Sequence, residues 1–284
     1  MERLTGGALD ERLREFLAED AGSRDVTTET TVSEDARALG EVVAKSACVL
    51  SGLDVARRVF ELTDPELVWA SEVLAGAPVA AGARLAQLAG RARAMLTAER
   101  VALNLLQRMS GIATTTRRYV DAVAGTPCRI LDTRKTAPGL RPFDRQAVRD
   151  GGGSNHRYDL SAMVLIKDNH RRLAGGVAAA VAAARAGAPR GMAIEVEVET
   201  ADELEAAAAA RVDWILIDNQ KPETVARWCR IVRARPGAPK IEASGGITLE
   251  RARAYAEAGA DAVSVGALTH SVAAADISLE ITPA

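Results

Sequence analysis

The chain has 284 residues, enough for one large domain or two modest ones with a sizeable core. Hydrophobic residues make up 48% of it, a share typical of globular proteins that argues against disorder. The net charge of −2 and the 3% aromatic content exclude a general nucleic-acid binder, because neither a basic excess nor a base-stacking surface is available.

Cysteine usage and the start of the chain indicate a compartment. Cys48, Cys128 and Cys229 lie far apart and form no CxxC pair, so neither a disulfide framework nor a structural zinc site is expected. Residues 1–4 lack the apolar run of a signal peptide, and the weakly polar residues 173–184 are too few to span a bilayer. We expect a cytoplasmic protein with no membrane partner.

The first part of the chain mixes helix and strand patterns. Helical spacing occupies residues 9–18, 53–62 and 96–123, a strand pattern residues 38–50, and a turn rich in Gly, Ala and Pro residues 75–83. The long helical pattern is expected to break near Ser110 and Gly111. This α+β segment shows no chemistry of its own.

From residue 129 onward, short apolar runs alternate with helical stretches. The runs are residues 129–131, 163–166, 194–198, 214–217, 241–243 and 262–265. The helical stretches are residues 176–185, 201–210, 222–234 and 249–258. This alternation favours parallel βαβ units and an α/β fold, either a full or incomplete (β/α) barrel or a doubly wound open sheet.

Polar groups follow the carboxyl ends of five of these runs, which favours the barrel. The five segments are 132–135, 167–170, 218–219, 244–246 and the stretch from Gly266 to His270. In a parallel barrel those ends share one mouth, where barrel enzymes keep their sites. The five together predict an active site.

A cationic set near the strand ends predicts an anion pocket. It comprises Arg134, Lys135, His156, Arg157 and Lys167. Arg offers a planar fork that fits carboxylate or phosphate, and Lys a compact charge. Solvated surface charge is the ordinary explanation for any one of them, but their place beside strand ends favours a pocket.

In residues 194–199, the period of two puts the three glutamates at positions 195, 197 and 199 on one face. Buried carboxylates need a cation, and Asp218 at the end of the next strand could face Glu197 about 5 Å away. Such a pair suits Mg²⁺, which binds one or two carboxylates together with substrate phosphates. Ion pairs with Lys167 or Lys135 are the alternative.

The last two strand ends are typical of phosphate-binding loops. Ser244-Gly245-Gly246 follows a strand and opens a helix, so backbone N–H groups could meet an anion. Ser264 and Gly266 come one unit later, where barrels commonly hold a phosphate. A carboxylate pocket, a Mg²⁺ pair and a phosphate end together favour a reaction between a small carboxylate and a phosphorylated sugar.

At these residues the chain closely resembles the quinolinate phosphoribosyltransferase family. The matching stretches are 25–28, 97–100 with Asn104, 106–114, 132–136, 138–141, 151–157, 166–170, 195–198, 218–219, 244–246 and 266–271. They run in order over nearly the whole chain.

The resemblance implies a fold and an assembly. The fold is an open (β/α) barrel, residues 113–271, with an N-terminal α/β sandwich domain, residues 1–112, joined by the tail 272–284. The assembly is a homodimer, or a larger oligomer, in which one subunit's barrel and the other's N-terminal domain share each active site.

The resemblance also implies substrates and residue roles, namely quinolinate and phosphoribosyl pyrophosphate giving nicotinate mononucleotide, pyrophosphate and carbon dioxide in NAD biosynthesis. Quinolinate would be held by Arg100 of the neighbouring subunit and by Thr133, Arg134, His156, Arg157 and Lys167. The phosphoribosyl donor would be held by Lys135, Glu197, Asp218, Ser244, Gly245, Gly246, Ser264, Gly266 and His270. The implied catalytic residues are Lys135, Glu197 and Asp218, the last two being also the Mg²⁺ ligands.

Two departures from the family pattern leave the acceptor open. Arg145-Gln146 stands where the family has Lys-Tyr, and Arg171-Arg172 where it commonly has apolar residues. The alternatives are a related phosphoribosyltransferase that acts on another aromatic carboxylate, and a non-catalytic sensor of a phosphorylated ligand. A sensor should lack Glu197, Asp218 or Lys135, and all three are present.

Overall fold

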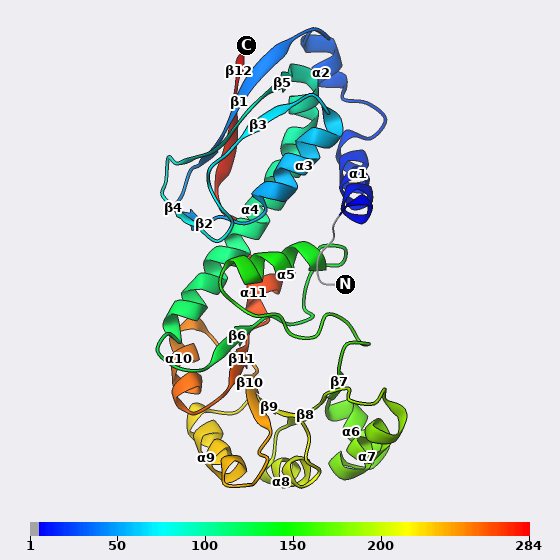
Figure 1. Cartoon of the computed structure of the whole chain (residues 1–284), viewed down its shortest axis with the longest axis vertical. Coiled ribbons are helices and arrows are strands. Elements are labelled where there is room, and N and C mark those ends of the chain that lie inside the picture. The colour runs from blue at the N-terminus through cyan, green and yellow to red at the C-terminus, as the bar shows by residue number, and fades with distance from the viewer. Residues whose placement is uncertain (1–5) are drawn as a thin grey trace. The chain divides into compact units, whose positions relative to one another are not determined.

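The computed structural model describes residues 6–284, and the chain forms two compact units (Figure 1). The first unit contains the chain up to Arg117 together with Thr136–Gly152 and Thr269–Ala284, and the second contains Arg118–Lys135 and Gly153–Leu268. The charged residues 1–4, which showed no signal peptide pattern, lie outside the described residues. The domain limits given above stay a prediction.

The first unit is built on a four-stranded antiparallel sheet in the order β12-β1-β5-β3. Its strands are β1 (Arg37–Ala44), β3 (Val68–Ala70), β5 (Arg84–Arg91) and β12 (Ile277–Pro283). Alternate residues of β1 are buried, as the period of two in a half-covered strand requires. The last strand of the chain therefore completes a sheet made by its first hundred residues.

Helices α3 (Leu53–Thr63) and α4 (Ala92–Ala122) lie along one face of this sheet (Figure 1). The first unit also contains α1 (Gly7–Ala21), α2 (Val26–Thr31) and α5 (Arg141–Asp150), and α4 continues into the second unit. On α3 the side chains of Val55, Ala56, Val59 and Phe60 are buried, a spacing that places them on one helical face.

Two details differ from the sequence-based expectation. Residues 38–50 form two strands, because β1 ends at Ala44 and a second short strand, β2 (Cys48–Val49), pairs with β4 (Pro78–Val79). The helix α4 does not break near Gly111. This glycine is needed for close packing instead, since a Cβ there would lie 2.2 Å from the carbonyl oxygen of Ala273.

The second unit holds a six-stranded parallel sheet in the order β6-β11-β10-β9-β8-β7. Its strands are β6 (Arg129–Leu131), β7 (Val164–Ile166), β8 (Ile194–Val198), β9 (Trp214–Asp218), β10 (Lys240–Ser244) and β11 (Ala262–Ser264). The first strand, β6, pairs with the last, β11, but not with β7. The barrel is therefore open between its first two strands, and the predicted fold class is confirmed.

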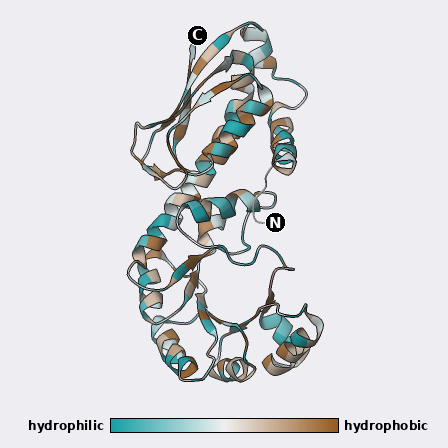
Figure 2. Cartoon of the chain, in the orientation of Figure 1, coloured by the Kyte–Doolittle hydropathy of each residue, from teal (hydrophilic) through white to brown (hydrophobic). Residues whose placement is uncertain are grey.

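The helices of this unit lie outside the curved sheet (Figure 1). They are α6 (Asp168–Ala174), α7 (Val177–Gly187), α8 (Ala201–Ala209), α9 (Pro222–Arg233) and α10 (Leu249–Glu257), with the short α11 (Ala267–His270) at its end. Hydrophilic and hydrophobic residues alternate along them in Figure 2, as expected for helices with one buried side. From β7 to β11, each strand lies beside the next strand of the chain. A doubly wound sheet needs a point at which this strand order reverses, so that alternative is excluded.

No helix within residues 6–284 is long and apolar enough to cross a membrane.

Candidate active site

The carboxyl ends of the barrel strands meet at one rim. Ser244 pairs in register with Asp218, and Ser264 with Leu131, the residue that precedes the segment 132–135. Because all six strands run parallel, the segments that follow them leave the sheet on the same side. The structure thus brings the predicted residues that end or directly follow barrel strands to one mouth.

An acidic group occupies one part of the mouth. Carboxylate oxygens of Glu197, Glu199 and Asp218 lie within 4.8 Å of one another. The Lys167 Nζ donates to Glu197 Oε2 at 2.8 Å, so the ion pair considered above is present beside this group. Burial and then the charge of Glu197 raise the pKa of Asp218. The charges of Lys167 and Lys135 therefore do not offset the acids, and a divalent cation fits them.

Cationic side chains occupy another part. Burial and then the charge of Arg134 lower the pKa of Arg157, so the two guanidinium groups are close enough to repel. Arg157 Nη1 donates to the carbonyl oxygen of Met163 at 3.0 Å, which fixes its direction. Lys135 lies close enough to the acids for its charge to oppose the rise in the pKa of Asp218. Two adjacent guanidinium groups are suited to a ligand with carboxylates.

The segment after Thr133 forms a tight turn at the end of β6. The Thr133 Oγ1 accepts a hydrogen bond from the Lys135 backbone N–H at 3.1 Å. This turn connects the part of the mouth that contains Arg134 with the part that contains Lys135.

The glycine loop after β10 has the backbone that only glycine adopts without strain. Gly245 and Gly246 have φ of +94° and +58°. A Cβ on Gly245 would lie 2.2 Å from Asn219 Oδ1, so the loop packs directly against the end of β9. It leads through Thr248 into α10, as an anion-binding helix start requires.

A buried hydroxyl lies one strand further along. Ser264 is 4% exposed, and its Oγ has no hydrogen-bond partner among residues 6–284. Buried polar atoms are normally satisfied, so an unpartnered hydroxyl at the mouth points to a ligand. Gly266, the other predicted residue of this loop, directly precedes α11.

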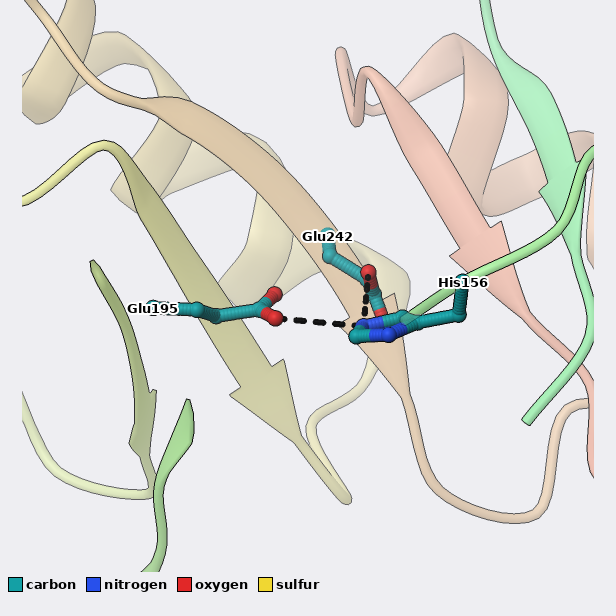
Figure 3. A group of neighbouring side chains, drawn as sticks. All are labelled: His156, Glu195 and Glu242. Carbon is teal, nitrogen blue, oxygen red and sulfur yellow. Dashed lines mark hydrogen bonds and ion pairs between the residues drawn. The ribbon is translucent and has the colours of Figure 1, made fainter. Parts of the chain in front are cut away.

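His156 was expected to line the anion pocket, but its ring faces two acids inside the barrel (Figure 3). Its Nε2 lies 3.1 Å from Glu195 Oε2 and 3.4 Å from Glu242 Oε2. From the sequence, a metal ion, Lys167 or Lys135 was the expected partner of Glu195, and Glu242 was missed. The available signal was a carboxylate in the middle of the apolar run 241–243.

Two predicted residues belong to the first unit. Arg100 is an exposed residue of α4, and His270 is an exposed residue whose Nδ1 lies 2.7 Å from Ser271 Oγ. Neither is brought to the mouth by the fold of the barrel itself. Their proposed roles therefore remain predictions.

The two departures from the family pattern have structural explanations. Gln146 Nε2 donates to Asp54 within the first unit at 3.3 Å. Arg171 is buried and forms an ion pair with Glu203 of α8. These two side chains are therefore engaged in packing between helices and not in the anion pocket.

Nearly the whole chain is similar to one known family. Residues 25–110 match the family described as quinolinate phosphoribosyl transferase, N-terminal domain, and residues 112–280 match the corresponding C-terminal domain. The nicotinate-nucleotide pyrophosphorylase [carboxylating] of Mycobacterium leprae is 42% identical over 283 residues, covering 96% of this chain and 97% of that protein. The probable enzyme of that name from Bacillus subtilis is 41% identical over 274 residues, covering 96% and 93%. The crystal structure of NadC from Streptococcus pyogenes superimposes with a TM-score of 0.94 at 39% identity, covering 100% of both chains.

Proposed function

The chain belongs to the quinolinate phosphoribosyltransferase family, and on this basis we propose that it converts quinolinate and phosphoribosyl pyrophosphate to nicotinate mononucleotide, pyrophosphate and carbon dioxide. The observation that carries the proposal is the divided mouth, where Arg134 and Arg157 lie in one part and Glu197 and Asp218 in the other. A dicarboxylate and a phosphorylated sugar with its metal ion need such a pair of neighbouring sites.

Glu197 and Asp218 are the proposed ligands of Mg²⁺, which when bound would neutralise charge on the departing pyrophosphate. Lys135 and the loop at Gly245 and Gly246 are proposed to hold the phosphate groups, through the ammonium and backbone N–H groups. As the bond from ribose C1 to the pyrophosphate oxygen breaks, positive charge develops at C1. Glu197 is proposed to stabilise this charge.

The pyridine nitrogen then forms its bond to C1. The guanidinium groups of Arg134 and Arg157 hold the acceptor carboxylates and so orient that nitrogen. The resulting pyridinium withdraws electrons from the adjacent carboxylate, which leaves as carbon dioxide. The electron pair of the broken bond stays on the ring carbon, which takes up a proton. No side chain acts as a nucleophile in this scheme.

The direct test is release of carbon dioxide from carboxyl-labelled quinolinate. We expect release that depends on both phosphoribosyl pyrophosphate and Mg²⁺, with stoichiometric nicotinate mononucleotide. Another aromatic acid serving as acceptor while quinolinate does not would contradict the assignment of the acceptor. Absence of any transfer would contradict the enzymatic function.

The assembly is proposed to be a homodimer that shares its active sites, because the resemblance assigns Arg100 of the first unit to the neighbour's pocket. Arg100→Ala and Lys135→Ala proteins should each be inactive. When they are mixed under conditions of subunit exchange, hybrid dimers contain one intact site, so part of the activity should return. Proven exchange with no recovered activity would contradict the shared site.

The cytoplasm is the proposed location. Cys48, Cys128 and Cys229 are buried and form no disulfide, which is compatible with a reducing compartment.

A further inference from the structure

The pair of acids around His156 is unusual for its burial. Glu195 and Glu242 are 0% and 1% exposed and come from β8 and β10, on either side of β9. Both side chains point toward the imidazole in Figure 3. Burial and then the charge of Glu242 raise the pKa of Glu195 to about 7. Two neighbouring buried carboxylates are costly for a fold, so stability does not explain them.

Each of these acids has a second carboxylate oxygen, Oε1, that does not contact His156. Oε1 of Glu195 and Oε1 of Glu242 are both buried without a hydrogen-bond partner among residues 6–284. The two acids, with His156 and Arg157, line a cavity of about 170 Å³ in the barrel. The two acids and Arg157, which is proposed to hold the acceptor, thus line the same cavity.

The ring is bonded on both of its nitrogens. The Arg157 backbone N–H donates to Nδ1 at 2.7 Å, so Nδ1 carries no proton at this geometry. The ring proton therefore lies on Nε2, between the ring and the two acids.

The backbone on either side of the ring is also fixed. The buried Asp132 accepts hydrogen bonds from the His156 backbone N–H at 2.7 Å and from the Asn155 side chain at 2.6 Å. Ser154 forms a parallel bridge with Leu131, on the edge of β6 that no strand covers. The imidazole extends this support to the backbone of Arg157.

We infer that Glu195 and Glu242 are positioning residues for the acceptor, which act through His156 to fix the backbone of Arg157 and thereby aim its guanidinium. The inference rests on the proposed function, and it predicts a specific defect. Loosening the ring displaces Arg157, whose guanidinium is proposed to bind the acceptor carboxylates. The loop at Gly245 follows β10, the strand of Glu242, but the Glu242 side chain contacts His156. Acceptor binding should therefore suffer and donor binding should not.

The test uses Glu195→Gln and Glu242→Gln, which keep the side-chain shape and remove the charge. In steady-state assays of the full-length protein, the KM for quinolinate should rise roughly 10- to 100-fold, the size of effect known for carboxylates that orient a metal-bound histidine. The KM for phosphoribosyl pyrophosphate should stay within about twofold of the wild-type value, because the contacts proposed to bind the donor are unchanged. Calorimetric titration of quinolinate without the donor should show the same loss.

Asp213→Asn and Asp261→Asn are matched controls. These carboxylates anchor the starts of the same two strands, accepting from the backbone N–H groups of Ile194 and Ile241 at 2.8 Å each. They perturb β8 and β10 without touching His156, so both KM values should be preserved. If Glu195→Gln fails to fold in thermal unfolding scans, Glu242→Gln, with the longer contact, provides the test.

Three outcomes separate the ideas. An inactive wild-type protein contradicts the proposed function itself. If the wild type is active, two results contradict the positioning role alone: Gln variants with a normal KM for quinolinate, and Gln variants in which the KM values for both substrates rise equally. An isolated rise in the quinolinate KM, absent from the Asp controls, supports it.

Discussion

Replacement of Asp218 by asparagine should slow phosphoribosyl transfer by roughly 100- to 1000-fold, because contacts to charge that develops in the transition state contribute about 2.7–4 kcal/mol. The substitution keeps the shape of the side chain and removes one of the three converging carboxylates. The pKa of Asp218 is raised by burial and by Glu197, so its removal also relieves repulsion and should not destabilise the barrel. The rate should be measured with both substrates saturating and Mg²⁺ varied.

The division of the mouth makes this prediction selective. Binding of quinolinate, followed by calorimetry without the donor, should change little in Asp218→Asn because the guanidinium groups are untouched. Asp202→Asn, at an exposed position in the first turn of α8, is the control and should behave like the wild type. A collapse of quinolinate binding with normal donor binding and normal Mg²⁺ dependence would contradict the division.

Replacement of Arg157 by lysine should weaken acceptor binding by roughly 10- to 100-fold, since lysine cannot reproduce the second hydrogen bond of the guanidinium fork, and a hydrogen bond to a charged group contributes about 1.5–3 kcal/mol. Lysine keeps the charge but lacks the planar fork, and it cannot donate to Met163 in the same geometry. The expected result is a higher KM for quinolinate with an unchanged KM for phosphoribosyl pyrophosphate. Initial rates with each substrate varied in turn provide the measurement.

Arg172→Lys is the control for this variant. Arg172 lies on α6 with an exposed side chain, paired only loosely with Asp168 at 3.7 Å. Its replacement should leave both KM values unchanged. An Arg157→Lys protein with a normal quinolinate KM would remove Arg157 from the acceptor pocket and would leave Arg134 as the principal candidate.

The elements of the barrel were predictable because each is a local pattern. The runs at residues 129–131 and 194–198 coincide with β6 and β8, and the helical stretches agree with α7 to α10 within about two residues. Apolar runs of strand length, bounded by turn residues, specify such strands whatever lies beside them. The first part of the chain was harder. Gly111 predicted a helix break, but the helix continues, and the lack of a side chain at Gly111 allows close contact with Ala273, some 160 residues later.

Candidate site residues were predictable where they follow a strand. Asp218, Ser244 and Ser264 end parallel strands, so one rule of topology places all three at the mouth. Glu242 could not be assigned in this way. It lies inside a strand, and its role depends on a contact with His156, which lies 86 positions earlier in the chain.

The sequence by itself therefore determined the alternation of strands and helices, the polar strand ends and the membership of the family, because these depend on neighbours in the chain and on ordered motifs. The tertiary structure decided which charges meet. Only folding places Glu195 and Glu242 on one imidazole and Lys167 on Glu197, since the energy of a buried charge depends on distances and on burial. Neither quantity is a property of a residue or of its neighbours in the chain.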